Sequence, residues 1–275
     1  MNRTVPKSPT WMALCIGNSR LHWALWTDDQ LQHTWHTPHL KQPFQVFSQE
    51  LFEAGQDSPA FQAVSQLDYD SCPELWLASV VPAQDKLWEA YPHLTVVTFA
   101  DIPIPDLYPT LGIDRAIALW GAGVHYGWPV LVLDGGTALT LTGADGEGRF
   151  VGGAILPGLQ LQARSLHGET AQLPLIEWPE CLPNPWAKDT VTALQSGILY
   201  TAIAGLATTL GQWCQAYPNS PIILTGGDGA VLANYLRQWQ QQNPSRLPGY
   251  PLQTDPYLIF RGLESLRQRR RGETP

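Results

Sequence analysis

The chain has 275 residues, of which 44% are hydrophobic and 15% charged, and its formal net charge is −8. This composition is typical of a globular protein long enough to bury one large core or two moderate ones. The acidic balance argues against a dedicated nucleic-acid binder, because phosphate backbones require clustered Lys and Arg. The one basic run, Arg267–Gly272, is interpreted as a solvated tail.

The cysteines and the first residues of the chain indicate the cellular compartment in which we expect the protein. The four cysteines, Cys15, Cys72, Cys181 and Cys214, lack the Cys-x-x-Cys spacing of zinc and redox sites. Such sparse cysteines fit a reducing compartment. The first nine residues lack the apolar core of a signal peptide, and no apolar run approaches the ~18 residues that span a bilayer. We therefore expect a soluble, cytoplasmic protein with neither a membrane nor a nucleic-acid partner.

The first half of the chain alternates strand and helix patterns. Two apolar stretches flank a polar turn within Met12–Trp26, which predicts strand, turn and strand. Three proline residues make Asp101–Pro109 a loop. The remaining predicted elements are a strand over Glu74–Val81, a helix over Ala83–Tyr91, a strand over Leu94–Phe99 and a helix over Ala116–Val124.

The second half repeats the opening pattern. The strand Val130–Leu133 is followed by the turn Asp134–Thr137 and a return strand over Ala138–Leu141. A glycine pair and a Pro-Gly precede a helical stretch within Phe150–Leu166, and the proline-rich segment Leu173–Trp186 is hypothesised to be a mobile flap. The last predicted elements are a long helix over Asp189–Tyr217, a strand over Ile222–Thr225, a glycine turn at Gly226–Gly229 and a helix over Ala230–Gln240.

These matched patterns predict an α/β protein built from two similar halves. Strands that alternate with helices indicate an α/β sheet, and one hairpin in each half indicates an internal repeat. We place the halves at residues 11–122 and 128–264, with a boundary near Gly121–Trp128 and an interdomain cleft. The twelve tryptophans are attributed to core and interface packing.

The hairpin turns are the first candidates for chemistry. Gly17, Asn18 and Ser19 in one half, and Gly135, Gly136 and Thr137 in the other, could present backbone amides to phosphate oxygens, with Asp134 beside them to hold a cation. Each turn alone is better explained as an ordinary hairpin turn, since Gly, Asn and Asp are the usual hairpin residues. A third glycine turn, Gly226-Gly227, favours nucleotide binding. None of the turns has the spacing of a P-loop or of Gly-x-Gly-x-x-Gly.

Asp114 has two interpretations that its spacing does not separate. It lies between Gly112 and Arg115 at the start of a predicted helix, where an acid is stabilised by the helix dipole. It could also be the general base for a substrate hydroxyl, with Arg115 attracting an anionic substrate.

Taken together and in order, these segments resemble the type III pantothenate kinases, the family of the Bvg accessory factor-like proteins. The similarity extends from Leu14 to about Gly262, nearly the whole chain. The matching segments are Gly17-Asn18-Ser19, Gly112–Arg115, Asp134–Thr137, Gly152-Gly153 with Pro157-Gly158, Thr190–Gly197 and Thr225-Gly226-Gly227.

The resemblance implies a fold, a reaction and a set of site residues. The fold is the duplicated RNase H-like fold of the acetate kinase/sugar kinase/Hsp70/actin class. The reaction is the phosphorylation of pantothenate by ATP with Mg²⁺ and K⁺ (or NH₄⁺), in a homodimer. ATP would contact Thr137 and the first loop, which comprises Cys15, Ile16, Gly17, Asn18, Ser19, Arg20, Leu21 and His22. Pantothenate would contact Tyr108, Gly112, Ile113, Asp114, Arg115 and Thr190, with Asp114 the proton acceptor and Asp134 the ligand of the monovalent cation.

The first loop departs from the family pattern at Cys15, where the family has aspartate. A neutral thiol supplies no charge to a metal unless its pKa falls. The departure keeps two alternatives open: a kinase of the same fold acting on another small substrate, and a degenerate nucleotide-binding or regulatory protein.

Overall fold

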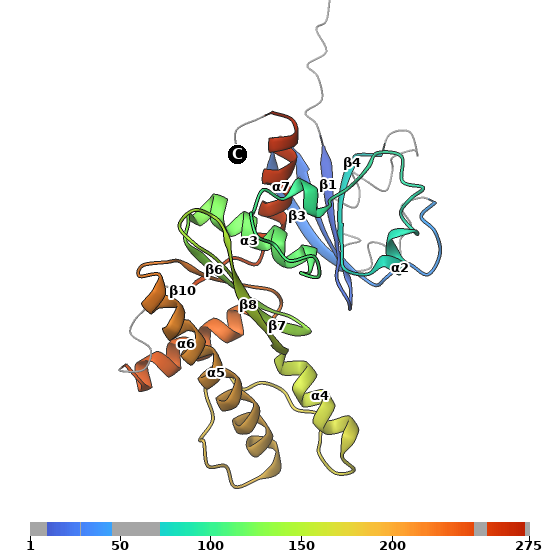
Figure 1. The fold of residues 1–275 in the computed structure, drawn as a ribbon. Helices are drawn as coiled ribbons and strands as arrows, with labels where there is room; N and C mark the ends of the chain where they lie inside the picture. The colour runs from blue at the N-terminus through green and yellow to red at the C-terminus, as the bar shows by residue number, and fades with distance from the viewer. Residues whose placement is uncertain (1–9, 28, 46–71, 245–251, 273–275) are drawn as a thin grey trace, which may run out of the picture. The chain divides into compact units, whose positions relative to one another are not determined.

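The computed structural model describes residues 10–27, 29–45, 72–244 and 252–272 (Figure 1). The described residues cluster into two compact units. The first unit comprises the chain up to Pro103, Pro109–Ile117 and the segment from Leu263 onward. The second unit comprises Ile104–Tyr108 and Ala118–Gly262.

The first unit contains a five-stranded mixed sheet with the strand order β3-β2-β1-β4-β5. Every residue of β1 is buried, as expected for a central strand that is covered on both faces. β1 pairs antiparallel with β2 and parallel with β4. The strands are β1 (Trp11–Ile16), β2 (Leu21–Thr27), β3 (Gln30–Thr37), β4 (Glu74–Ser79) and β5 (Leu94–Val96).

The second unit contains a sheet of the same design, in the order β10-β9-β6-β7-β8. β6 and β7 form the predicted hairpin, and β6 pairs parallel with β9. In each sheet three antiparallel strands lie to one side of two parallel strands, which confirms the predicted duplication. The strands are β6 (Val130–Gly135), β7 (Ala138–Ala144), β8 (Phe150–Pro157), β9 (Ile222–Thr225) and β10 (Leu252–Thr254).

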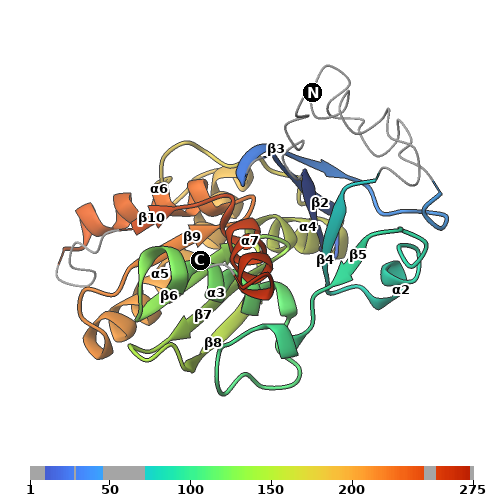
Figure 2. The same cartoon turned by 90° about the horizontal axis from the view of Figure 1, so that it is seen from above.

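The helices connect and cover these strands. In the second unit α6 packs along β9 and β10 (Figure 2). Both α3 and α7 contribute residues to each unit. The helices are α2 (Pro82–Asp85), the 3₁₀ helix η3 (Phe99–Asp101), α3 (Ile113–Tyr126), α4 (Leu159–Glu169), α5 (Thr190–Ala216), α6 (Gly229–Gln242) and α7 (Leu258–Arg270).

Some predicted elements are wrong in length, and some strands are not predicted at all. The helix expected over Ala83–Tyr91 ends at Asp85. The backbone amides that follow donate to the carbonyl three residues back rather than four, which is the pattern of a tighter turn. The side chains of Trp88 and Tyr91 are buried in the core. The strand expected over Leu94–Phe99 ends at Val96, before η3. Strands β3, β8 and β10 are not predicted; β8 carries the Gly152-Gly153 pair, which weakens a strand pattern.

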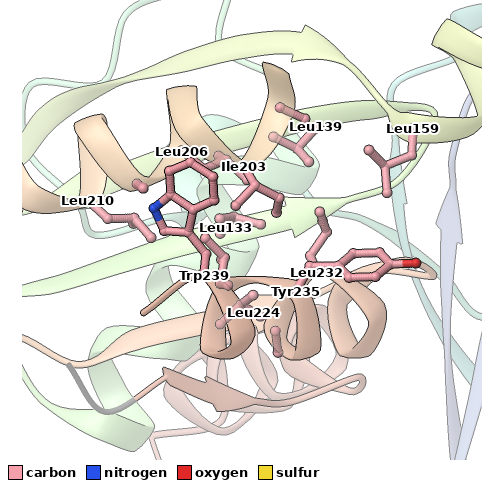
Figure 3. Packing of buried hydrophobic residues seen from close by; sticks show 14 of the residues in the cluster. Leu133, Leu139, Leu159, Ile203, Leu206, Leu210, Leu224, Leu232, Tyr235 and Trp239 are labelled. Carbon is pink, nitrogen blue, oxygen red and sulfur yellow. The ribbon is translucent and has the colours of Figure 1, made fainter. Parts of the chain in front are cut away.

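The second unit is held together by one hydrophobic cluster between its sheet and helices α5 and α6. Figure 3 shows Ile203, Leu206 and Leu210 of α5 meeting Leu133 and Leu139 of the hairpin. Full burial of each such leucine contributes about 2 kcal/mol. From the other side, α6 adds Leu232, Tyr235 and Trp239.

The long helix α5 corrects one sequence expectation. Among the described segments it alone is long and apolar enough to cross a membrane by composition, with a mean hydropathy of 1.3 over its best window. Its buried residues belong to the hydrophobic cluster of the second unit, among them Leu199, Ile203 and Leu210. Because 39% of its most apolar stretch is buried, α5 contributes one face to that core.

The tryptophans of the first unit are core residues, as predicted. Trp11 and Trp26 stack with ring centroids 4.0 Å apart, and Trp23 packs edge-on against Trp88 at 5.2 Å. All four side chains are almost fully buried. In the second unit Trp186 departs from this expectation, because 86% of its surface is exposed.

The proline-rich segment Leu173–Trp186 is irregular, but its backbone is extensively bonded, which argues against the mobile flap. Proline removes amide donors but leaves carbonyl acceptors. The carbonyls of Pro179, Pro183 and Pro185 accept bonds from the hydroxyl groups of Tyr235, Tyr200 and Ser196, respectively. Further side-chain donors to this segment are His167, Gln195, Asn234 and Gln238.

The basic run at the carboxyl end is exposed from Arg269 onward, as predicted, but its first residue is not part of a solvated tail. Its first arginine, Arg267, lies on α7 and its side chain is only 2% exposed. Arg267 Nε donates to Glu74 Oε2 at 3.0 Å, and its guanidinium lies 4.7 Å from the Trp11 ring. The pairing partner is 193 residues away in sequence, so local composition gives no sign of it.

We predict that Arg267→Ala lowers the free energy of unfolding by about 3 kcal/mol, because it leaves Glu74 without its buried partner and opens space beside Trp11. Arg269→Ala, two residues on and exposed, is the matched control and should change it by less than ~0.5 kcal/mol. Denaturant titration of both variants measures the difference. Equal stabilities would show that Arg267 is not an anchor.

Candidate active site

The first turn connects β1 to β2. The Gly17 amide donates to Arg20 O at 3.1 Å and closes the turn, leaving Asn18, Ser19 and Arg20 exposed. His39 Nε2 lies 2.8 Å from Gly17 O and donates to it. The turn is therefore fixed at both ends, and its polar side chains are exposed.

Beneath this turn lies a neutral histidine. Burial, with the neighbouring His36 and Arg20, lowers the pKa of His22 to about 4. The His22 and His36 rings meet edge-on with centroids 4.7 Å apart. At pH 7 His22 thus offers a hydrogen bond without a positive charge.

Cys15 pairs with His22 across the hairpin and is only 5% exposed. Burial raises the pKa of the Cys15 thiol well above its usual range, and the negative charge of Asp114 raises it further. The thiol is therefore neutral at physiological pH and supplies no charge to a metal. Its burial is that of a structural cysteine in a strand.

Asp114 lies in the first turn of α3 and is half-buried. Its Oδ1 accepts from the Arg115 amide at 2.8 Å. A Cβ atom on Gly112 would lie 2.5 Å from the same Oδ1, so only glycine leaves room for the carboxylate there. Burial raises the pKa of Asp114, against the opposing effects of the Arg115 amide and charge. A carboxylate held in this way is a stronger base than one in water.

The second turn follows β6 and carries Asp134. The Gly136 amide donates to Ala138 O at 3.0 Å, and the Gly158 amide donates to Thr137 O at 3.0 Å. A Cβ atom on Gly158 would overlap Gly136 O, which explains the Pro-Gly after β8. Thr137 itself is exposed at the rim of the turn.

The third glycine turn lies directly against the second. Gly226 has a φ of +80°, and a Cβ atom there would collide with Asp134 Oδ1 and lie 2.5 Å from Gly135 O. Asp228, two residues on, donates its amide to Gly135 O at 2.8 Å. Pairing of β6 with β9, which sets Asp134 opposite Thr225, brings the two turns together.

Asp228 is a candidate residue that the sequence reasoning missed. It is half-buried at the start of α6, but its side chain does not cap the helix. Burial raises the pKa of its carboxyl group. An aspartate directly after Gly226-Gly227 was the available signal.

The structure sorts the sequence-predicted residues into two groups. The first loop and Gly112–Arg115 belong to the first unit; Tyr108, Asp134, Thr137 and Thr190 belong to the second. Tyr108 and Thr190 are exposed. Within the described residues, no group of three or more His, Cys, Asp or Glu side chains forms a metal cage. Asp134 fits a cation that completes its shell with water and phosphate oxygens.

The fold and these turns define a class of protein. Two sheets of equal topology, each with a glycine turn after its first strand, are typical of the nucleotide-dependent enzymes of the sugar kinase and actin fold. A Baf family protein from Campylobacter jejuni has this fold, with a TM-score of 0.61 at 18% identity over 95% of this chain and 99% of that chain. A ROK family glucokinase from Streptomyces griseus matches with a TM-score of 0.51 at 12% identity, over 94% of this chain and 99% of that chain.

Within this class the chain belongs to the type III pantothenate kinase family. The family model for type III pantothenate kinase matches residues 11–211. A type III pantothenate kinase from Nostoc sp. is 44% identical over 265 residues, which cover 93% of this chain and 94% of the relative. The predicted family and fold class are thus confirmed.

We predict that Gly226→Ala lowers the free energy of unfolding by about 2 kcal/mol or more, because the positive φ and the contact with Asp134 both oppose a side chain. Gly227→Ala is the control, since no atom lies within 4 Å of its added Cβ and its φ is not positive. That variant should stay within ~1 kcal/mol of the parent. The close packing of the two turns would be contradicted by equal denaturation midpoints.

Proposed function

We propose that this chain transfers the γ-phosphate of ATP to the primary hydroxyl of pantothenate, which yields 4′-phosphopantothenate and ADP at the first step of coenzyme A biosynthesis. The observation that carries the proposal is the half-buried Asp114 carboxylate, held over Gly112 in a chain of the type III pantothenate kinase family. The two sequence halves, residues 11–122 and 128–264, would each supply one phosphate-binding turn.

In the proposed reaction Asp114 is the general base. The pantothenate hydroxyl oxygen attacks the γ-phosphorus, the bond to the bridging oxygen of ADP breaks, and the hydroxyl proton passes to the Asp114 carboxylate. Arg115 would attract the pantothenate carboxylate, with Ile113, Tyr108 and Thr190 as further substrate contacts.

The nucleotide would bind at the glycine turns. The Gly17 and Gly136 amides close their own turns, so the other amides of these turns and the Thr137 hydroxyl would contact the phosphate oxygens. We assign Asp134 to K⁺ (or NH₄⁺) and, through water, to Mg²⁺; a bound cation would offset the phosphate charge. Because Mg²⁺ needs only one or two carboxylates besides phosphates and water, the neutral Cys15 is compatible with an active enzyme.

The assembly and the compartment are also proposals. Four apolar side chains on β8 and α4, Val151, Ile155, Leu161 and Leu166, are between 38% and 64% exposed. Exposed apolar residues on neighbouring elements support a homodimer. All four cysteines are free, which supports a cytoplasmic location.

A coupled ADP-release assay tests the proposed function. Pantothenate should drive ADP release in the presence of Mg²⁺ and K⁺, while other small hydroxylated acids and sugars should not. If another acceptor and not pantothenate drives ADP release, that acceptor is the substrate. If no acceptor drives ADP release, the chain is a degenerate nucleotide-binding protein.

We predict that Asp114→Asn lowers turnover about 10²–10⁴-fold, because the amide cannot accept the proton. In the parent, the acid limb of the pH–rate profile should lie above the ordinary aspartate pKa of 3.8, since burial raises the pKa of Asp114. Near-parent turnover in Asp114→Asn would remove Asp114 from the mechanism.

The stability of this variant provides a control. The pKa of Asp114 is higher in the folded than in the unfolded protein, so ionisation of Asp114 lowers the free energy of unfolding. This loss is absent below the unfolded-state pKa and is complete once the pH has risen through the folded-state pKa. Asp114→Asn should therefore be at least as stable as the parent at pH 7, and the difference should vanish on acidification. A loss of stability at pH 7 would point to misfolding instead.

The cation assignment makes a separate prediction. If Asp134 holds a monovalent cation, the parent should turn over much faster in potassium than in sodium buffer, and Asp134→Ala should abolish the difference. Equal parent rates in both salts would remove the cation site but leave the kinase assignment in place.

A further inference from the structure

Tyr108 lies in a short loop whose position is set by a hairpin outside the glycine turns. Ile104–Tyr108 belongs to the second unit, although Gly112–Arg115, a few residues on, belongs to the first. Within the loop Ile104 is buried, whereas Tyr108 is 39% exposed. The neighbouring element is the β7–β8 hairpin, whose tip is Asp145–Arg149.

Backbone and ring contacts join the loop to the first residue of β8. The Phe150 amide donates to Pro105 O at 3.1 Å. The Phe150 ring packs against the Tyr108 ring with centroids 5.6 Å apart and planes inclined at 60°. Phe150 thus fixes both the loop backbone and the orientation of the Tyr108 ring.

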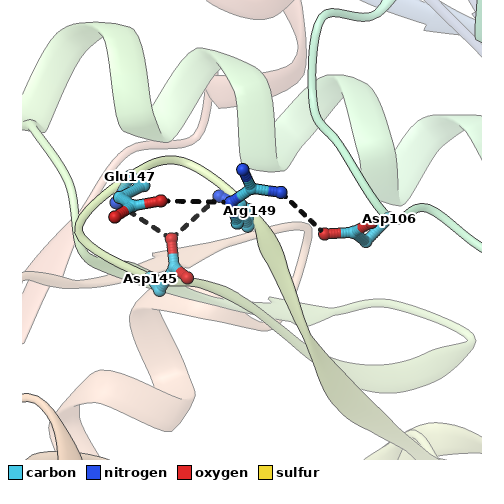
Figure 4. A network of polar contacts seen from close by, with 4 residues as sticks. All are labelled: Asp106, Asp145, Glu147 and Arg149. Carbon is cyan, nitrogen blue, oxygen red and sulfur yellow. Dashed lines mark hydrogen bonds and ion pairs between the residues drawn. The ribbon is translucent and has the colours of Figure 1, made fainter.

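Charged groups make a second connection beside the first (Figure 4). Arg149 Nη1 lies 3.4 Å from Asp106 Oδ2, while its Nε donates to Glu147 Oε2 at 3.1 Å. Asp145 Oδ1 accepts from the Arg149 amide at 2.9 Å, which holds the arginine backbone in place. Asp106 has a φ of 67°, a left-handed conformation that a surrounding structure must maintain.

The hairpin tip has a firm support of its own. Gly148, with a φ of +74°, is buried against Trp128: a Cβ atom there would lie 3.3 Å from the indole. The Trp128 indole in turn covers Gly123 of α3, where a Cβ atom would collide with it. The tip therefore cannot shift without displacing a packed indole.

We propose that Arg149 and Phe150 are positioning residues for pantothenate: with Asp106 and Tyr108 they form a clasp that holds the Tyr108 ring in its binding orientation. The inference rests on the proposed function, in which Tyr108 contacts the substrate. An exposed ion pair contributes little to global stability, so its loss should act on the order of the loop. A ligand that must order a loose loop binds more weakly.

Steady-state kinetics tests the clasp. Arg149→Ala should raise the KM for pantothenate about 3–10-fold and Phe150→Ala about 10–30-fold, with kcat and the KM for ATP within about twofold. Phe150→Tyr keeps the ring and should restore the parent value. Glu147→Gln is the matched control, because it weakens the pair within the hairpin but leaves the bond from Arg149 to Asp106.

A double-mutant cycle isolates the ion pair. Asp106→Asn, which tolerates the left-handed conformation, should raise the pantothenate KM as much as Arg149→Ala, and the double variant should add little. Additive effects would contradict a functional pair between these two residues.

Hydrogen exchange of the amide of residue 150, which donates to Pro105 O, tests the clasp without any substrate. Exchange should become faster in Arg149→Ala and Phe150→Ala than in the parent and Glu147→Gln. The proposal would be overturned by unchanged exchange rates or by an unchanged KM for pantothenate. It would also be overturned if kcat and the KM values for pantothenate and ATP all changed by the same factor. If the parent phosphorylates a different acceptor, the proposed function fails, and the clasp is judged by that acceptor's KM together with the exchange rates.

Discussion

The constraint on which the second unit depends is the close approach of backbone to backbone around Asp134. The turn after β6 and the turn after β9 touch through Gly135 and Gly226, and Gly158 closes on Gly136 from β8. No side chain fits at any of these contacts. Because the parallel pairing of β6 with β9 sets Asp134 opposite Thr225, the register of the sheet also determines how the two glycine turns meet around Asp134. The hydrophobic cluster beneath, between β6, α5 and α6, keeps that register fixed.

In the first unit the close contact involves a carboxylate, that of Asp114, which we propose to be the catalytic base. Gly112 leaves room for the Asp114 carboxylate, and burial raises its pKa instead of stabilising its charge. The Arg115 amide and charge compensate this carboxylate only in part, and perturbed carboxylates of this kind cluster at sites where chemistry needs a base. Cys15 fits this account: an aspartate there would add a second buried negative charge beside Asp114, whereas the neutral thiol does not.

The parts that could be predicted from the sequence are those set by short-range patterns. Two apolar strands around Gly-Asn-Ser, and two around Asp-Gly-Gly-Thr, predict hairpins and hence the duplication, while the ordered motifs identify the family. The rest depends on contacts between distant residues. Arg267 is buried only because Glu74 and Trp11 meet it across the first unit. The segment Leu173–Trp186 is pinned by side chains from three helices, and β8, with its two glycines, forms by pairing with β7. Asp228 becomes a candidate only when its turn is seen against Gly135.

In the proposed reaction Asp114 activates the pantothenate hydroxyl, so that this oxygen rather than water attacks the γ-phosphate of ATP. Phosphorus NMR of the parent enzyme with ATP, Mg²⁺, K⁺ and pantothenate tests it most directly, because the products are distinguished by their phosphorus environments. The account predicts a phosphomonoester resonance that grows in step with ADP and is nearly absent for Asp114→Asn. ADP accumulating with inorganic phosphate alone, or ATP that persists unchanged, would contradict it.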